Sequence, residues 1–181
     1  MIENLYNFID RTSSKTVLIF GIVIIFIINL LVFPYFSTLF PENNFSEKYI
    51  LDLRFSYDAA TVLYNFEMLG AIGRNVYFWL ILVFDVPYAF VYGYVYAALI
   101  IILYKNYKPK AAKILFIFPI IMMFSDTIEN IGIITMLTTY PKINETGSGI
   151  FSFFTSLKWL STIPTFPAII WGVIMKYVFK K

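Results

Sequence analysis

The sequence predicts an all-α fold: a four-helix transmembrane bundle with a partly helical outer loop between spans one and two. Of the 181 residues, 60% are hydrophobic and 14% are charged, whereas soluble domains have about 45–50% apolar and about 25% charged residues. The mean hydropathy is +0.76, and the apolar residues gather in four long runs. Because this length suits one compact bundle, we expect residues 1–181 to form a single integral membrane domain.

The four apolar runs are long enough to cross the bilayer, since a spanning helix needs about 20 residues. The predicted spans cover residues 17–39, 76–104, 114–140 and 150–177. The first run exceeds a signal-peptide core and no small-residue cleavage site follows it, so we expect an uncleaved span. Before it, residues 1–16 are polar, with Leu5, Phe8 and Ile9 in a short interfacial turn.

The outer loop, residues 40–75, contains a helical pattern. Its apolar positions recur at helical spacing, at Ala59, Val62, Leu63, Phe66 and Leu69. Ser56 or Asp58 is the candidate N-cap, and Gly70 and Gly73 are placed to end or bend the helix. We favour a short helix resting on the membrane surface; the alternative is a lid over a cavity.

The basic residues predict the orientation, because cytoplasmic segments of membrane proteins carry an excess of Lys and Arg. With the N-terminus inside, nine basic residues fall on the inner side: Arg11, Lys15, Lys105, Lys108, Lys110, Lys113, Lys176, Lys180 and Lys181. The outer loops hold four: Lys48, Arg54, Arg74 and Lys142. We therefore expect both termini in the cytoplasm and the protein in the plasma (inner) membrane.

Polar residues inside the spans are the candidate functional positions. Asp126, Glu129 and Asn130 stand at i, i+3 and i+4, so they share one face of the third span. An ionised carboxylate at this depth costs roughly 2.5 kcal/mol or more. The other spans contribute Asn29, Asp85, Tyr88, Tyr92 and Lys158. Counted from the predicted span ends at about 1.5 Å per residue, the charged residues and Asn29 fall in one layer in the outer half of the bilayer.

Several chemistries are excluded by composition. The chain has no cysteine and no histidine, so disulfides, thiol catalysis, zinc–thiolate sites and the usual general base are absent. No phosphate-binding loop, zinc-protease motif or serine-based catalytic motif occurs, and nothing indicates nucleic-acid binding. We expect no cofactor and assign no catalytic or metal-binding residue.

The spacing of these polar residues resembles a known pattern. It comprises Gly73-Arg74, Asp85, Asp126-x-x-Glu129-Asn130, Tyr140-Pro141 and Thr155-x-x-Lys158. This resembles an uncharacterised family of small four-span, bacterial-type membrane proteins with acidic residues in span three and a lysine in span four. The resemblance covers roughly residues 55–165 and implies the four-span fold, but it implies no activity.

Three carboxylates in the layer face one lysine, so we expect at least one of them to be protonated. We interpret the layer as a ligand or proton site formed by Asp85, Asp126, Glu129, Asn130, Lys158, Tyr88 and Tyr92. Glu129 is the expected partner of Lys158, because the two lie at similar depth. A purely structural interpretation, in which the ion pair and its hydrogen bonds fix the helix register, stays open.

Three functions are compatible with such a site. The preferred one is binding or translocation of a small cation or proton. The alternative is an intramembrane enzyme or binding protein for a lipid or isoprenoid-like substrate, which requires a cavity opening sideways to lipid. The second alternative is a non-catalytic membrane assembly partner. Membrane lipids are expected contacts, and the sequence leaves enzymatic activity and homo-oligomerisation open.

Overall fold

The computed structural model describes residues 2–40 and 49–179, and within these ranges the chain is helical and contains no β-strand. Four stretches are long and apolar enough to cross a membrane. They are Lys15–Thr38, Ala59–Tyr104, Pro109–Thr139 and Glu145–Val178. The predicted all-α fold is confirmed, and the helices have the length and composition of an integral membrane protein.

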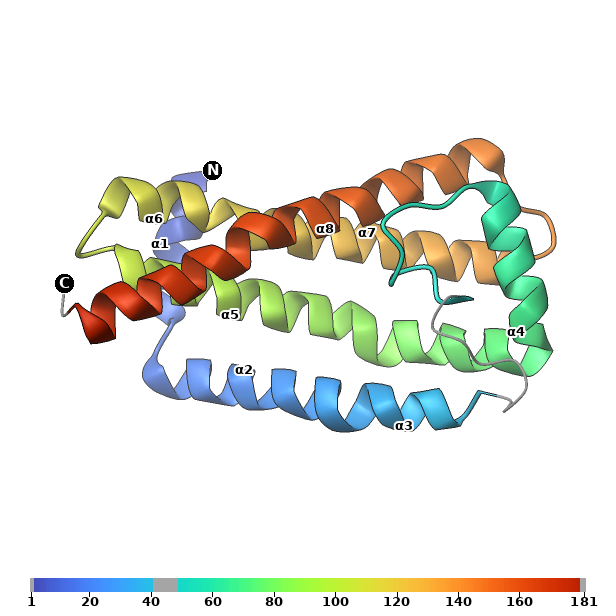
Figure 1. The fold of residues 1–181 in the computed structure, drawn as a ribbon, viewed down its shortest axis with the longest axis horizontal. Coiled ribbons are helices and arrows are strands. Elements are labelled where there is room, and N and C mark those ends of the chain that lie inside the picture. The colour runs from blue at the N-terminus through green and yellow to red at the C-terminus, as the bar shows by residue number, and fades with distance from the viewer. Residues whose placement is uncertain (1, 41–48, 180–181) are drawn as a thin grey trace.

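The bundle is built around α5 (Val86–Tyr104), which lies between the other long helices (Figure 1). α7 (Ile117–Thr139) and α8 (Glu145–Val173) form the most extensively packed pair and lie on one side of α5. The first span consists of α2 (Lys15–Ile27), a π-helical turn (Ile28–Val32) and α3 (Phe33–Thr38). It lies on the other side of α5 and packs mainly on that helix. Both termini lie at one end of the bundle, called the terminal end below (Figure 1).

The opposite end is covered by residues 49–69, called the cap below. α4 (Ala59–Leu80) begins after Asp58, whose carboxylate accepts the Thr61 N–H at 2.8 Å, so the N-cap is Asp58 and not Ser56. Gly70 then adopts φ 64° and ψ −179°, a conformation essentially restricted to glycine. The resulting kink lays the first half of α4 across the bundle end (Figure 1).

The second span is longer at its start than predicted. After Gly70, α4 continues through a π-helical turn, Ile81–Asp85, into α5, so the predicted loop helix and span two form one kinked stretch, Ala59–Tyr104. The sequence pattern correctly placed the bend at Gly70. It could not show that helical hydrogen bonding resumes directly after it.

The polar N-terminus forms a full helix and not the predicted short turn. α1 (Ile2–Thr12) packs against α5 and buries Tyr6 and Ile9, whereas Phe8 is exposed. α6 (Pro109–Leu115) lies at the same end and leads into α7. The buried positions of α1 are three residues apart, as expected for one helix face.

Two apolar cores fill the bundle, one at each end. The core at the terminal end includes Ile101 and Phe116, and the core beneath the cap includes Phe66 and Ile133. The buried polar residues of α7 lie between Phe116 and Ile133 in the chain, so they occupy a layer between the two cores. This arrangement agrees with the polar layer expected from the sequence.

Candidate functional site

A buried lysine joins two carboxylates at the centre of the polar layer. The Nζ atom of Lys158 lies 2.7 Å from Oε2 of Glu129 and 3.1 Å from Oδ1 of Asp126. The three side chains are 10%, 0% and 6% exposed. The ammonium also donates a hydrogen bond to the carbonyl oxygen of Asp52 in the cap, at 3.2 Å. Three acceptors therefore surround the three N–H donors of Lys158.

Close packing of α7 and α8 brings these charges together. Gly132 on α7 contacts the ring of Phe151 on α8, and a side chain at this position would collide with that ring. Three residues before Gly132, Glu129 faces α8, where Thr155 and Lys158 are also three residues apart. Each pair therefore lies on one face of its helix, and the two faces meet.

The remaining carboxylate oxygens of these two residues also have partners. The Thr155 hydroxyl donates to Oε1 of Glu129 at 2.8 Å, and the Tyr92 hydroxyl donates to Oδ2 of Asp126 at 2.7 Å. Both carboxylates are thus bound on both oxygens, one by the lysine and one by a neutral hydroxyl. Polar groups buried among helices need such partners, because no water replaces them.

A fourth carboxylate reaches the layer from the cap, and sequence analysis missed it. The Tyr77 hydroxyl donates to Oδ1 of Asp52 at 2.6 Å and accepts the Leu51 N–H at 3.0 Å. Asp52 lies in the part of the outer loop that precedes the helical pattern, where it is one of several acidic residues. No spacing of apolar or polar residues distinguishes it from the others. The predicted count of three carboxylates for one lysine therefore becomes four.

Asp85 differs from the other carboxylates of the layer because, among the described residues, neither a cation nor a hydroxyl group binds it. It is 7% exposed, and among the described residues no side chain forms an ion pair or a hydrogen bond of standard geometry with it. Its polar neighbour is the Asn130 amide, which is fully buried and whose two polar atoms lack hydrogen-bond partners within the same part of the chain. Asp85 and Asn130 therefore retain free hydrogen-bonding capacity.

Another neutral donor lies on the cap side of the cluster. The Tyr57 hydroxyl is buried and makes no hydrogen bond to the described residues. Burial raises the pKa of Tyr57, so its hydroxyl keeps its proton at neutral pH. The backbone N–H of Tyr57 is held by Ser152 on α8 at 2.7 Å, which fixes this part of the cap against the bundle.

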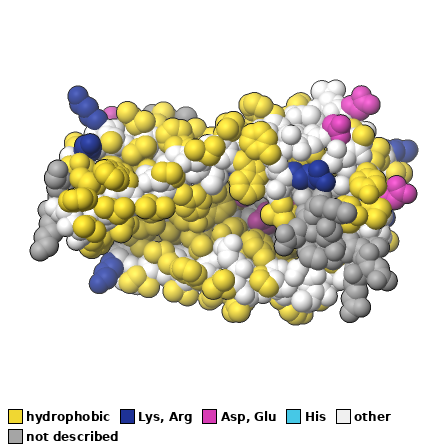
Figure 2. All heavy atoms as spheres, viewed as in Figure 1, with side chains coloured by type: hydrophobic (Ala, Val, Ile, Leu, Met, Phe, Trp, Pro, Cys, Tyr) yellow, Lys and Arg dark blue, Asp and Glu magenta, His cyan; other side chains and the backbone are white. Residues whose placement is uncertain are grey.

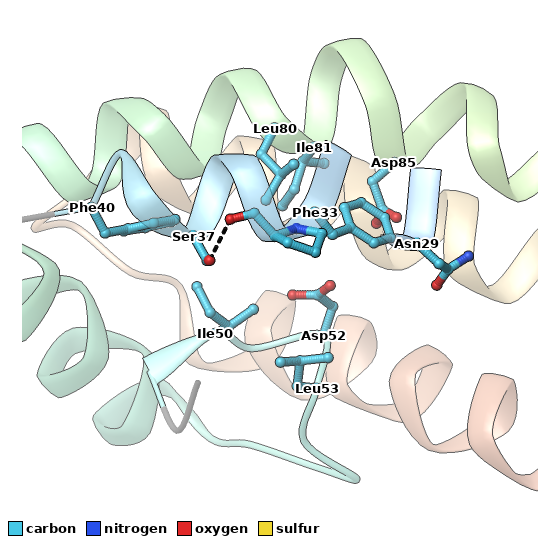
Figure 3. Close-up of a pocket in the computed structure, with 11 residues that line it drawn as sticks. Asn29, Phe33, Ser37, Phe40, Ile50, Asp52, Leu53, Leu80, Ile81 and Asp85 are labelled. Carbon is cyan, nitrogen blue, oxygen red and sulfur yellow. Dashed lines mark hydrogen bonds between the residues drawn. The ribbon is translucent and has the colours of Figure 1, made fainter. Parts of the chain in front are cut away.

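A cavity of about 360 Å³ opens beside the cluster, between the first span, the cap and the start of span two. Asn29, Asp52 and Asp85 supply polar groups to its lining (Figure 3). The remaining lining residues are mostly apolar: Phe33, Pro34, Ser37, Phe40, Ile50, Leu53, Leu80 and Ile81. We call this the acidic cavity. It combines two carboxylates with walls suited to hydrocarbon.

A second cavity, of about 430 Å³, lies between the first span and the bundle on the side toward the terminal end. Tyr88, Tyr92 and Tyr96 form its wall, with ring centroids 5.1 and 5.8 Å apart. The remaining lining is Ile25, Phe26, Asn29, Leu30, Met122 and Phe166. We call this the tyrosine cavity. Figure 2 shows an apolar hollow between α2 and α8, with acidic side-chain atoms visible at one end.

Asn29 connects the two cavities, because it lines both. Its amide donates to the Tyr88 hydroxyl at 2.6 Å and to the carbonyl of Ile25 at 2.8 Å. Tyr88, which the sequence predicted to belong to the site, therefore contacts Asn29. Its hydroxyl accepts the hydrogen bond from Asn29, the residue that lines both cavities.

Two π-helical turns shape the acidic cavity. In the first span the Phe33 N–H bonds to the Ile28 carbonyl, and in span two the Val86 N–H bonds to the Ile81 carbonyl, five residues back in each case. Each turn ends two residues before a proline, Pro34 or Pro87, which has no N–H to continue the regular pattern. Such turns occur frequently at functional sites. The first holds Asn29 and the second holds Asp85.

The structure therefore unites most of the predicted site. Asp126, Glu129, Lys158 and Tyr92 form one network, as expected, and Glu129 is the closer partner of the lysine. Among the described residues, no group of three or more acidic side chains is arranged to hold a metal ion.

No family model, curated protein or solved structure matches this chain at a significant level. The resemblance to small four-span membrane proteins stays a prediction from the sequence. Any functional conclusion must therefore come from the geometry of the site.

Proposed function

We propose that this protein binds an amphipathic, lipid-like molecule that enters from the bilayer. The polar head of this ligand would occupy the acidic cavity, and its apolar part would lie along the tyrosine cavity. The observation that carries the proposal is the composition of the acidic cavity, where Asp52 and Asp85 face walls contributed by aromatic and aliphatic side chains. A ligand for such a space needs both a polar and an apolar part.

The position of the first span supports entry from the side. This span packs mainly on α5, and only 11% of its most apolar window is buried, so most of its surface faces outward. Both cavities lie between this span and the rest of the bundle. Phe26 and Leu30, which line the tyrosine cavity, are 59% and 65% exposed. A hydrocarbon chain could therefore pass from lipid into the cavity without crossing a polar surface.

The site favours this function over the cation-binding role preferred from the sequence. Asp126 and Glu129 already have a cation, the Lys158 ammonium, and their other oxygens accept hydroxyl hydrogen bonds. A small cation at these carboxylates would have to displace the lysine of the protein itself. Asp85 instead has no ion-pair partner among the described residues, and it faces a space much larger than one ion.

The test is to identify amphiphiles that co-purify with the protein in mild detergent, using mass spectrometry of the extracted complex. A phenylalanine at Ser37, which lines the acidic cavity, should fill it and abolish co-purification. The matched control is Thr38→Phe, because Thr38 is the next residue, is exposed and is absent from the cavity lining.

Retention of one amphiphile by wild type and Thr38→Phe, with loss in Ser37→Phe, supports the proposal. Equal recovery from both variants, or no enriched amphiphile in wild type, contradicts it. Proton or cation uptake into proteoliposomes that depends on Asp85 would favour transport in its place.

A further inference from the structure

Among the described residues, the carboxylates around the acidic cavity outnumber the cationic side chains. The polar layer contains Asp52, Asp85, Asp126 and Glu129, and Lys158 is paired with the last two. Asp52 accepts a hydrogen bond from Tyr77, which is neutral, and Asp85 has no ion-pair partner among the described residues.

Arg74, a cation on α4, has its contacts elsewhere. Its guanidinium donates to the carbonyl of Phe66 at 2.7 Å and lies 4.2 Å from the centroid of the Tyr140 ring. It does not line the acidic cavity. Among the described residues, the charged groups with the largest effects on Asp85 are Asp126, Asp52 and Lys158, so acidic groups outnumber basic ones in this set.

From this imbalance we infer that the head group bound in the acidic cavity is cationic, a protonated amine or a quaternary ammonium. The inference rests on the proposed function, since it names the class of amphiphile that the same cavity takes. The ammonium lies between Asp52 and Asp85, where it supplies a positive charge that no described residue lining the cavity supplies.

The walls of the cavity suit such a group. Phe33 and Phe40 present aromatic rings on the first span and at its end, and an ammonium is attracted to the face of such a ring. The cavity volume of about 360 Å³ accommodates a substituted ammonium and the first carbons of its chain. An anionic head, such as a phosphate, would meet two carboxylates at short range and be repelled.

Asp85 is the residue that we expect to contribute most to binding the ammonium. It is more than nine-tenths buried, it ends the π-helical turn that lines the cavity, and the neighbouring Asn130 amide has no other partner in the described chain. An acidic side chain in such a place is costly without compensation. A ligand ammonium provides that compensation.

The experiment compares three amphiphiles with the same dodecyl chain: dodecyltrimethylammonium, dodecanol and dodecyl phosphate. Each is titrated below its micellar concentration into the full-length protein in maltoside detergent, with thermal unfolding as the readout for Kd. For wild type we expect the ammonium to bind most tightly and the phosphate to be the weakest. In Asp85→Asn the Kd for the ammonium should rise about tenfold, equivalent to about 1.4 kcal/mol, while that for dodecanol stays within about twofold.

Two further variants keep the test interpretable. Asp52→Asn should weaken the ammonium in the same way, and it serves if Asp85→Asn does not fold. Asp58→Asn is the matched control, because Asp58 is exposed, lies outside the cavity, and caps α4 in a way that asparagine can reproduce. It should leave all three affinities unchanged.

The outcomes separate this inference from the proposed function. If dodecanol or the phosphate binds as tightly as the ammonium, or if the Asp85 and Asp52 variants bind the ammonium like wild type, the cationic head group is wrong and amphiphile binding stands. If none of the three binds and no amphiphile co-purifies, both proposals fail.

Discussion

Two sets of ion pairs in this molecule have similar lengths and different surroundings. In the polar layer, Lys158 lies 2.7 Å from Glu129 and 3.1 Å from Asp126, with side chains no more than 10% exposed. At the terminal end, Lys105, which directly follows α5, lies 2.7 Å from Asp10 on α1, with side chains 37% and 31% exposed. Distance alone therefore does not distinguish the two sets; burial does.

Burial changes what each pair contributes to the free energy of unfolding. Removing one partner of a buried pair leaves an uncompensated charge and typically costs about 3–5 kcal/mol. An exposed pair contributes about 0–1 kcal/mol, because water solvates each partner after the other is removed. The charges at the terminal end therefore cost little, because water solvates them, whereas the charges of the polar layer are buried where apolar side chains would cost less free energy.

The largest effect is expected at Lys158. Lys158→Met should destabilise the protein by about 3–5 kcal/mol, because it leaves Asp126 and Glu129 without their cation in the interior. Reversible unfolding in detergent or bilayer discs measures this change. Adding Glu129→Gln should recover much of it, as expected for a coupled pair.

The double-mutant cycle also tests which carboxylate dominates. Lys158→Met with Asp126→Asn should recover less than the Glu129 combination, because Glu129 is the closer and more completely buried partner. A Lys158→Met/Glu129→Gln protein no more stable than Lys158→Met alone would refute the dominant pairing. A stable double mutant that has lost ligand binding would show that the layer is more than a structural device.

The next effect compares two tyrosines on α5. The Tyr92 hydroxyl donates to the buried Asp126, whereas the Tyr94 hydroxyl donates to Thr12 on α1 at 2.9 Å, near the surface. Tyr92→Phe should cost about 1–3 kcal/mol and Tyr94→Phe under about 1 kcal/mol. Both variants remove one oxygen atom from the same helix, so each serves as control for the other. Equal losses of stability in the two variants would show that burial does not determine how much each hydrogen bond contributes.

Much of the fold was predictable from local features of the sequence. Apolar runs gave the spans, helical spacing located the cap helix, and Gly70 marked its bend. Within the site, the i, i+3 spacing correctly placed Asp126 and Glu129 on one face. These predictions succeed because helix periodicity depends on neighbours along the chain.

The rest of the site depends on contacts between distant segments. Asp52 enters the layer only because the cap folds back over α8, where Lys158 binds its carbonyl oxygen. The two cavities exist because the first span stands away from much of the bundle, and no periodicity encodes that separation. The lack of an ion-pair partner for Asp85 among the described residues also follows from this tertiary arrangement.

A smaller effect is expected at the pair between α1 and α5. Lys105→Met should cost at most about 1 kcal/mol, since both partners keep access to water. Raising the salt concentration from 0.1 to 1 M, which shortens the Debye length from about 10 to about 3 Å, should reduce that cost further. The same salt change should leave the Lys158→Met cost nearly unaltered. Salt titration of unfolding for both variants measures the contrast.

The smallest effect is expected at Glu3, whose carboxylate lies 2.6 Å from Lys113 with side chains 69% and 52% exposed. The hydrogen bond from Lys113, and then its charge, lower the pKa of Glu3 below the ordinary value of 4.5. A lowered pKa means that the folded protein binds this proton less readily than the unfolded chain does. The stabilisation is therefore present above about pH 4.5 and is lost as the pH falls through the lower folded pKa. Glu3→Gln should lower the Tm slightly at pH 7 and not at pH 3, and 1 M salt should remove the difference at pH 7. If Glu3→Gln lowers the Tm as much as Lys158→Met does, burial is not what separates the two sets of ion pairs.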